Sequence, residues 1–363
     1  MKLSDTLPQF PWDTLAEAKA TAQAHPGGIV DLSVGTPADP VPQIVLDQLA
    51  DSGKRWHGYP TVQGTPELQR AMIGYLERRW NSVELSERNV LPVMGTKELV
   101  AWLPLQAGVQ PGQRVVIPEV AYPTYEVGAL LARAEIVRCD DPARLTGNPA
   151  LIWLNTPANP HGAIASADEL RAWVEYARSA GALLVSDECY GEFSWDAQSY
   201  SLLDPQINGG SLDNILACFS LSKRSNMAGY RAGFVAGCES VVQELLAIRK
   251  HAGAMVAGPV QDAMVVALDD DAHVEVQRQR YLRRREKLSA ALNQAGFEID
   301  HSEGSLYLWA SRGEPARETV GWLAERGILT APGDFYGEAE PTHVRIGLTA
   351  LDERIEAACE RLC

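Results

Sequence analysis

One lysine stands in a polar segment between two apolar runs. Residues 214–237 read NILACFSLSKRSNMAGYRAGFVAG, and Lys223 follows the first run, whose continuous apolar residues indicate a strand buried on both faces. The hydroxyls of Ser220 and Ser222 and the permanent cation of Arg231 flank its amine. Such groups can hold a phosphate beside an amine. A lysine on an ordinary surface loop is the alternative that this segment alone leaves open.

An amine beside a phosphate site is what a pyridoxal phosphate enzyme requires. A lysine amine bonds to the cofactor aldehyde, and donors around the phosphate keep the aldehyde carbon in place. Lys223 also lies just past the carboxyl end of its predicted strand, where open α/β sheets bind their ligands. The segment therefore favours a cofactor site at this end of a sheet.

Four more candidate side chains follow other predicted strands. Tyr122 lies beyond the strand Val115–Ile117, Asn159 beyond LIWLN, and Asp187 and Tyr190 at the end of ALLVS. In a parallel sheet these positions meet in one crevice with Lys223, so one ligand can contact all five. A buried acid is costly unless it is paired, and a cationic ring nitrogen is a suitable partner for Asp187. A satisfied core aspartate is the alternative.

Other candidates lie at turns and in a late strand. Gly95 and Thr96 open a helix whose free amides can bind an anion, although Thr96 can equally be a plain N-cap. Gly35 allows close approach of a ligand or simply a tight turn. Tyr59 lies in a loop with other aromatic residues, and a surface aromatic turn is its alternative. Arg345, in the apolar run VRIGL, can bind a substrate carboxylate or form a structural ion pair.

The composition restricts the function classes. The 363 residues are 46% hydrophobic and 22% charged, and the net charge of −15 argues against nucleic-acid partners and a polybasic membrane surface. No window approaches the roughly 20 apolar residues of a membrane span, and the start lacks the apolar core of a signal peptide. We expect a soluble, cytoplasmic protein. The six cysteines form no C-x-x-C pair or zinc-finger spacing, which predicts free thiols and no metal site.

The order of the predicted elements indicates an α/β fold. Strands and helices alternate from residue 90 to residue 237, long helices follow, and a mixture of strands and a helix ends the chain. We expect a mostly parallel central sheet in a large domain and a smaller α+β domain. The predicted divisions are an N-terminal arm that contributes to the small domain (1–42), a large cofactor-binding domain (43–255) and a small C-terminal domain (256–363).

These residues lie in an ordered series of motifs that resembles a known family. The series is the GTP turn at Gly35, GYPTVQG, MGTKEL, NTPANPHG with SDECY, SLSKRSNMAGYRAGF, and VRIGL at the end. Over essentially its whole length the chain resembles the fold type I pyridoxal phosphate aminotransferases of classes I and II. The resemblance implies that fold, that cofactor and small amino and oxo acids as substrates.

The resemblance implies roles for the residues around the cofactor ring. Lys223 resembles the lysine that bonds to the cofactor and moves the proton between the substrate and the cofactor. Asp187 resembles the acid that keeps the ring nitrogen protonated. Tyr190 and Asn159 resemble the donors to the phenolic oxygen, and Tyr122 resembles the aromatic residue that stacks on the ring.

The resemblance implies further roles at the phosphate and the substrate. The residues that match the phosphate site are Gly95, Thr96, Lys97 (through its backbone amide), Ser220, Ser222 and Arg231. Tyr59 resembles a tyrosine that reaches the phosphate of the neighbouring subunit, which implies a homodimer with shared active sites. Arg345 resembles the arginine that binds the substrate α-carboxylate, with Gly35 and Asn159 beside it.

Two segments of the sequence suggest a particular substrate. SKRSNMAGYRAG and VGTPADPVP are similar to succinyldiaminopimelate aminotransferases, which exchange an amino group between glutamate and N-succinyl-2-amino-6-oxopimelate in lysine biosynthesis. Lys97 and Arg224 are candidate cations for the distal group, and neither is assigned. A β-lyase, a decarboxylase or an aminotransferase for another amino acid stays open, because a fold does not fix the reaction. A regulatory protein that has borrowed the fold is disfavoured by the absence of spare length and of a basic face.

Overall fold

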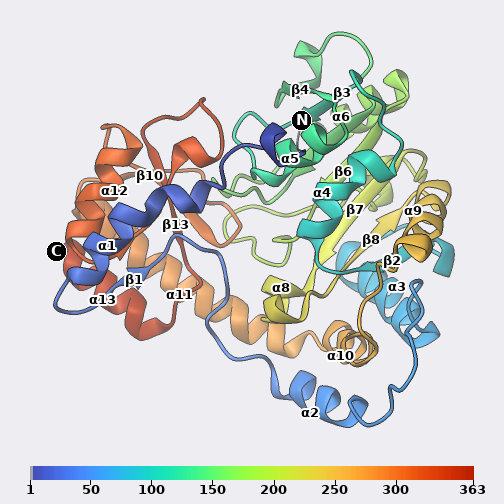
Figure 1. Cartoon of the computed structure of the whole chain (residues 1–363), viewed down its shortest axis with the longest axis horizontal. Helices are drawn as coiled ribbons and strands as arrows, with labels where there is room; N and C mark the ends of the chain where they lie inside the picture. The colour runs from blue at the N-terminus through green and yellow to red at the C-terminus, as the bar shows by residue number, and fades with distance from the viewer. Residues whose placement is uncertain (1–2) are drawn as a thin grey trace.

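The computed structural model describes residues 3–363, which form two lobes (Figure 1). The larger lobe is built on a seven-stranded sheet and the smaller on a four-stranded sheet. In spatial order the large sheet consists of β2 (Val90–Val93), β8 (Gly233–Gly237), β7 (Ile215–Ser220), β6 (Leu183–Asp187), β5 (Leu151–Asn155), β3 (Arg114–Ile117) and β4 (Glu135–Arg138). No helix within 3–363 is long and apolar enough to cross a bilayer.

The central sheet is mostly parallel, as predicted. The pairs β7–β6, β6–β5, β5–β3 and β3–β4 are parallel, and only β8 runs antiparallel to its neighbours β7 and β2. The carboxyl ends of β3, β5, β6 and β7 therefore lie at one edge, where the candidate side chains follow. Sequence analysis did not predict β4, which lies at the end of the sheet and has no fully buried residue.

Helices cover both faces of the large sheet because its strands are apolar on both sides. Leu216 and Cys218 of β7 pack with one cluster, and Ala217 and Phe219 pack with another on the opposite face. The first face is covered by α4 (Thr96–Gln106), α5 (Thr124–Leu131) and α9 (Glu239–Ala252); the second by α3 (Pro66–Trp80), α6 (Ala167–Ala180) and α10 (Gly258–Asp269).

The small domain consists of an antiparallel sheet with helices around it. Its strand order is β12 (Ala331–Pro332), β13 (His343–Gly347), β10 (Tyr307–Ser311) and β9 (Glu298–Asp300). The helices of this lobe are α1 (Ala16–Ala24), α11 (Ala272–Gln294), α12 (Ala316–Glu325) and α13 (Asp352–Leu362). A short parallel pair of β1 (Val30–Asp31) and β11 (Ile328–Leu329) joins the N-terminal segment to this lobe.

The packing of the N-terminal segment and of helix α10 indicates where the two domains divide. Leu15, Val30 and Leu32 of the N-terminal segment belong to the core of the small domain. Helix α10 contributes Ala263 and Met264 to the core that contains β7 and β8, so it packs with the large domain. Helix α2 (Gln43–Ser52) lies beside α10 (Figure 1). We propose that the small domain begins at α11 rather than at residue 256.

The cysteines are unpaired in the structure. All six are free thiols, as the sequence predicts, and three of them, Cys139, Cys218 and Cys238, are buried. The fold therefore depends on packing and not on covalent cross-links within the described chain.

Candidate active site

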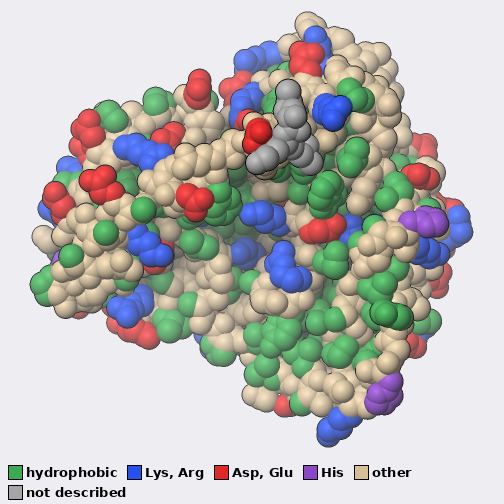
Figure 2. Space-filling model, viewed as in Figure 1, with side chains coloured by type: hydrophobic (Ala, Val, Ile, Leu, Met, Phe, Trp, Pro, Cys, Tyr) green, Lys and Arg blue, Asp and Glu red, His purple; other side chains and the backbone are tan. Residues whose placement is uncertain are grey.

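A cavity of about 700 Å³ lies between the two domains. In Figure 2, Lys and Arg side chains gather in the hollow between the lobes. Twelve of the fourteen predicted site residues line the cavity: Gly35, Thr96, Lys97, Tyr122, Asn159, Asp187, Tyr190, Ser220, Ser222, Lys223, Arg231 and Arg345. The structure thus brings together residues that are more than three hundred positions apart in the sequence.

Lys223 lies on a short helix, α8 (Leu221–Arg224), that begins directly after β7. The Ser220 hydroxyl caps this helix and accepts a hydrogen bond of 3.1 Å from the Ser222 amide. The Lys223 amine donates to the Gly35 carbonyl oxygen. Burial lowers the pKa of this amine, Tyr307 opposes that shift and the Arg345 cation adds to it. A larger fraction of the amine is therefore neutral and able to accept a proton than in an exposed lysine.

Asp187 ends β6 and is buried. Its carboxylate accepts a hydrogen bond of 2.9 Å from the Tyr125 hydroxyl and one of 3.2 Å from the Cys189 amide. Burial raises the pKa of Asp187, and the hydrogen bonds from Cys189 and Tyr125 partly offset that shift. Within residues 3–363 its hydrogen-bond partners are all neutral, so a cationic group beside it would stabilise its charge. Sequence analysis missed Tyr125, which lies in an apolar helix.

The predicted phosphate site forms around the start of α4. Gly95 is the N-cap, with φ of 79°, and Thr96 is the first helical residue, so the interpretation of Thr96 as the N-cap is wrong. A Cβ at Gly95 would overlap the Arg231 guanidinium, which explains the glycine there. The amides of the first turn and the Arg231 cation form a donor set for an anion. Burial, with the nearby Arg231 cation, lowers the pKa of Lys97.

Arg345 reaches the cavity from β13 and is 2% exposed. It donates a hydrogen bond of 2.8 Å to the Asn159 side-chain oxygen and one of 2.7 Å to the Ser33 carbonyl oxygen. Its Nε has no partner in residues 3–363. No carboxylate neutralises this cation within the described residues, so the structural ion-pair alternative is wrong. A buried guanidinium with a spare donor is suited to a substrate carboxylate.

Two tyrosines meet in the cavity wall. The Tyr190 and Tyr307 hydroxyls are 3.0 Å apart, and Tyr307 was not predicted as a site residue. Tyr122 lines the same cavity, and burial raises its pKa to about 12. The predicted aromatic and hydroxyl groups are therefore present as neutral donors and ring surfaces.

The residues present fit pyridoxal phosphate on three observations. The cradle at Gly95 and Arg231 suits the phosphate, and the buried Asp187 carboxylate suits the protonated ring nitrogen. The half-buried Lys223 lines the same cavity as Asp187 and Arg231. A pyridine ring, an aldehyde and a phosphate are thus each matched by a side chain of this chain.

The family comparison decides the identity. The family model "Aminotransferase class I and II" matches residues 28–362. The chain belongs to this family. It is a pyridoxal phosphate-dependent aminotransferase with the fold type I architecture. When bound, the cofactor acts as the electron sink that makes the substrate α-proton removable.

The chain is similar to several named proteins. It is 55% identical to the probable aminotransferase Rv1178 of Mycobacterium tuberculosis over 99% of this chain and 86% of that protein. It is 52% identical to the 4-dedimethylamino-4-oxo-anhydrotetracycline transaminase OxyQ of Streptomyces rimosus over 98% and 99%. The structure of a probable N-succinyldiaminopimelate aminotransferase from Thermus thermophilus is 28% identical, with a TM-score of 0.88 over 97% and 99% of the two chains.

Two candidate side chains, Tyr59 and Arg224, do not line the cavity. Tyr59 is 95% exposed and does not line the cavity, so its contact with a neighbouring subunit stays a prediction. Arg224, a candidate for the distal group, is 3% exposed and pairs with Glu192 and Asp271 outside the cavity. Lys97 lines the cavity and is the candidate that stays.

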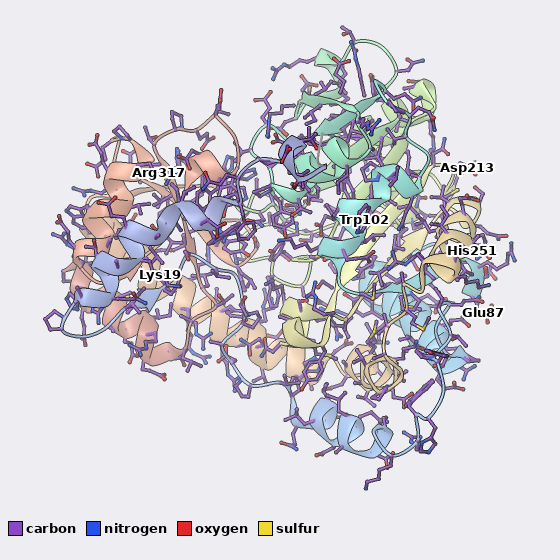
Figure 3. All side chains as sticks on the ribbon, viewed as in Figure 1. Lys19, Glu87, Trp102, Asp213, His251 and Arg317 are labelled. Carbon is purple, nitrogen blue, oxygen red and sulfur yellow. The ribbon has the colours of Figure 1, made fainter. Side chains whose placement is uncertain are left out.

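Sequence analysis also missed the contribution of the N-terminal arm to the cavity. Its residues Phe10, Trp12, Leu15 and Lys19 line the cavity. Figure 3 shows Lys19 on α1, a helix of the small domain. The aromatic pair at residues 10 and 12 was the available signal, but nothing in the sequence indicates which surface it covers.

Proposed function

We propose that this aminotransferase exchanges an amino group between glutamate and N-succinyl-2-amino-6-oxopimelate. The observation that carries the proposal is a second cation in the cavity: Lys97 lines it together with Arg345. Arg345 would bind the α-carboxylate, and Lys97 would attract the distal anionic group of a long substrate. The likeness to a solved structure named as a probable N-succinyldiaminopimelate aminotransferase supports this choice.

In this proposal one residue of the chain transfers the proton and four others position the reacting groups. The neutral Lys223 amine takes the α-proton and returns it on the cofactor side, because burial keeps part of it unprotonated. Asp187 would hold the ring nitrogen in its protonated form. Asn159 and Tyr190 would donate to the phenolic oxygen. Arg345, which Asn159 holds by a 2.8 Å hydrogen bond, would fix the substrate so that its α-hydrogen faces the amine. The two half-reactions alternate, which gives ping-pong kinetics.

A second acceptor class is an oxo group on a fused ring system. The 52% identity to a transaminase named for an oxo-anhydrotetracycline, over nearly all of both chains, favours it. The cavity wall offers aromatic surface for such an acceptor through Phe10, Trp12 and Tyr122. The two candidates differ in charge, because only the succinylated acid brings further carboxylates to Lys97.

The test is an acceptor comparison with the purified, cofactor-loaded enzyme. We expect kcat/KM for the succinylated oxo acid to exceed that for pyruvate by at least about 100-fold, and Lys97→Met to reduce this preference about tenfold. Lys223→Ala serves as the inactive control. Equal rates with all small oxo acids, or a preference that survives Lys97→Met, would contradict the proposed substrate while leaving the aminotransferase assignment intact. Preference for the ring ketone would favour the second class.

A further inference from the structure

Tyr307 lies beside the predicted catalytic residues, although the sequence analysis did not predict it as a site residue. It is 2% exposed, lines the cavity and lies on β10 of the small domain. Its hydroxyl is 3.0 Å from the hydroxyl of Tyr190, a large-domain residue that follows β6. A Cβ at Gly35 would overlap the Tyr307 hydroxyl, so the glycine keeps the space that this hydroxyl occupies.

The surrounding charges favour one direction of the hydrogen bond between the two tyrosines. Burial raises the pKa of both phenols, but the cations of Arg345 and Lys223 bring the pKa of Tyr307 below its ordinary value, whereas that of Tyr190 is raised. Since the phenol with the lower pKa is the better hydrogen-bond donor, this difference favours Tyr307 as the donor in the 3.0 Å pair.

The ring of Tyr307 contacts a second site residue. The Arg345 guanidinium lies 4.1 Å from its centroid, which is a close cation–π contact. Asn159 and the Ser33 carbonyl hold two other donors of the same guanidinium. The ring therefore supports one face of the group that would bind the substrate carboxylate.

We propose that Tyr307 is a positioning residue with two separable parts. Its hydroxyl donates to Tyr190 and so directs the Tyr190 proton toward the cofactor oxygen, while its ring holds the Arg345 guanidinium in place. One side chain of the small domain thus supports both the cofactor side and the carboxylate side of the site. The proposal concerns the transamination and does not depend on which acceptor the enzyme uses; its ring test rests on glutamate, the donor proposed above.

The hydroxyl is tested by a pH titration of the visible absorbance of the cofactor-loaded enzyme. That absorbance follows the protonation of the nitrogen through which Lys223 joins the cofactor. Tyr307→Phe leaves Tyr190 a weaker donor, so the cofactor oxygen is less stabilised as an anion and the protonated form persists to higher pH. We expect the midpoint to rise by roughly half a pH unit to one pH unit.

Two controls separate this role from packing. Tyr336→Phe also removes a buried hydroxyl near Arg345, but that hydroxyl has no partner in residues 3–363, so the midpoint should not move. In a Tyr190→Phe background, Tyr307→Phe should add no further shift. An unchanged or lower midpoint in Tyr307→Phe, or a full shift in the Tyr190→Phe background, would overturn the role of the hydroxyl.

The ring is tested by the KM for glutamate. Tyr307→Phe keeps the ring, so its KM should stay within about twofold of the native value, whereas Tyr307→Leu should raise it about tenfold. Circular dichroism and thermal melting establish that both variants are folded. A KM that rises equally in both variants would overturn the separate role of the ring.

Discussion

The Gly95–Arg231 contact shows how one missing side chain can make a binding site. Gly95 has φ of 79°, and the Arg231 guanidinium occupies the space that its Cβ would fill. Arg231 is itself in the left-handed region, with φ of 53°, and donates 3.0 Å to the Ala228 carbonyl oxygen. The hydrogen bond to the nearby Ala228 carbonyl therefore holds the guanidinium in place, and position 95 has room for it only if that residue has no side chain.

Gly95→Ala should weaken cofactor binding. The new methyl group displaces the Arg231 guanidinium from the phosphate site, so we expect the dissociation constant of pyridoxal phosphate to rise at least about tenfold, by the loss of one charge-assisted contact. Fluorescence titration of the cofactor-free enzyme measures it. Gly108→Ala is the matched control, because Gly108 has nearly the same φ of 78° but nothing within 4 Å of its Cβ position. Equal effects in the two variants would show that backbone strain alone is responsible.

Helix α8 is the element that carries the reactive lysine, and a buried ion-pair network anchors it. Arg224, next to Lys223, pairs with Glu192 at 3.1 Å and with Asp271 at 3.0 Å. Its guanidinium also lies 4.8 Å from the Tyr75 ring. Because a helix of four residues has little stability of its own, this network holds the lysine in place.

Arg224→Met should destabilise the fold and not merely the site. The change leaves Glu192, which is 5% exposed, with fewer partners in the interior, so we expect a loss of about 3 kcal/mol in the free energy of unfolding. Urea denaturation followed by circular dichroism measures it. Arg88→Met, which breaks the exposed pair with Glu239, is the control and should have little effect. A loss in Arg224→Met no larger than in this control would contradict the anchoring role.

The elements that the sequence predicts best are the apolar strands that end at the site. The runs before Asn155, Asp187 and Ser220 are buried on both faces, and this leaves a strong signal in the sequence. Strand β4 has only partly buried and exposed residues, so its pattern resembles a loop. The antiparallel direction of β8 depends on pairing and leaves no sequence signal of its own.

The missed site residues share a different cause. Tyr125 lies in an apolar helix and Tyr307 in an apolar strand, where an aromatic residue normally indicates core. Their partners are far away in the sequence, Asp187 by 62 positions and Tyr190 by 117. A hydroxyl that acts through such a distant partner can be recognised only after the chain has folded.

At the scale of the whole molecule, the exposure of Tyr59 bears on the assembly. Its side chain is 95% exposed, an unusual state for a tyrosine, and it lies in a loop with Trp56 and His57. Two large apolar residues of α4, Trp102 and Leu105, are also exposed, and Figure 3 shows Trp102 on this helix. Exposed aromatic groups of this kind favour an interface, and we propose a homodimer in which Tyr59 completes the active site of the other copy.

Mixing two inactive variants tests this shared site. The Lys223→Ala subunit keeps Tyr59 but lacks the reactive amine, whereas the Tyr59→Ala subunit keeps the amine but lacks the tyrosine. Each homodimer should therefore have strongly reduced transaminase activity. A mixed dimer has one site with both groups intact. After unfolding together and refolding at equal amounts, half of the dimers are mixed, and we expect about a quarter of the native activity per total subunit. Light scattering establishes the dimer. Because a site built within one subunit can never regain both groups, a mixture no more active than the average of its parents would exclude the shared site.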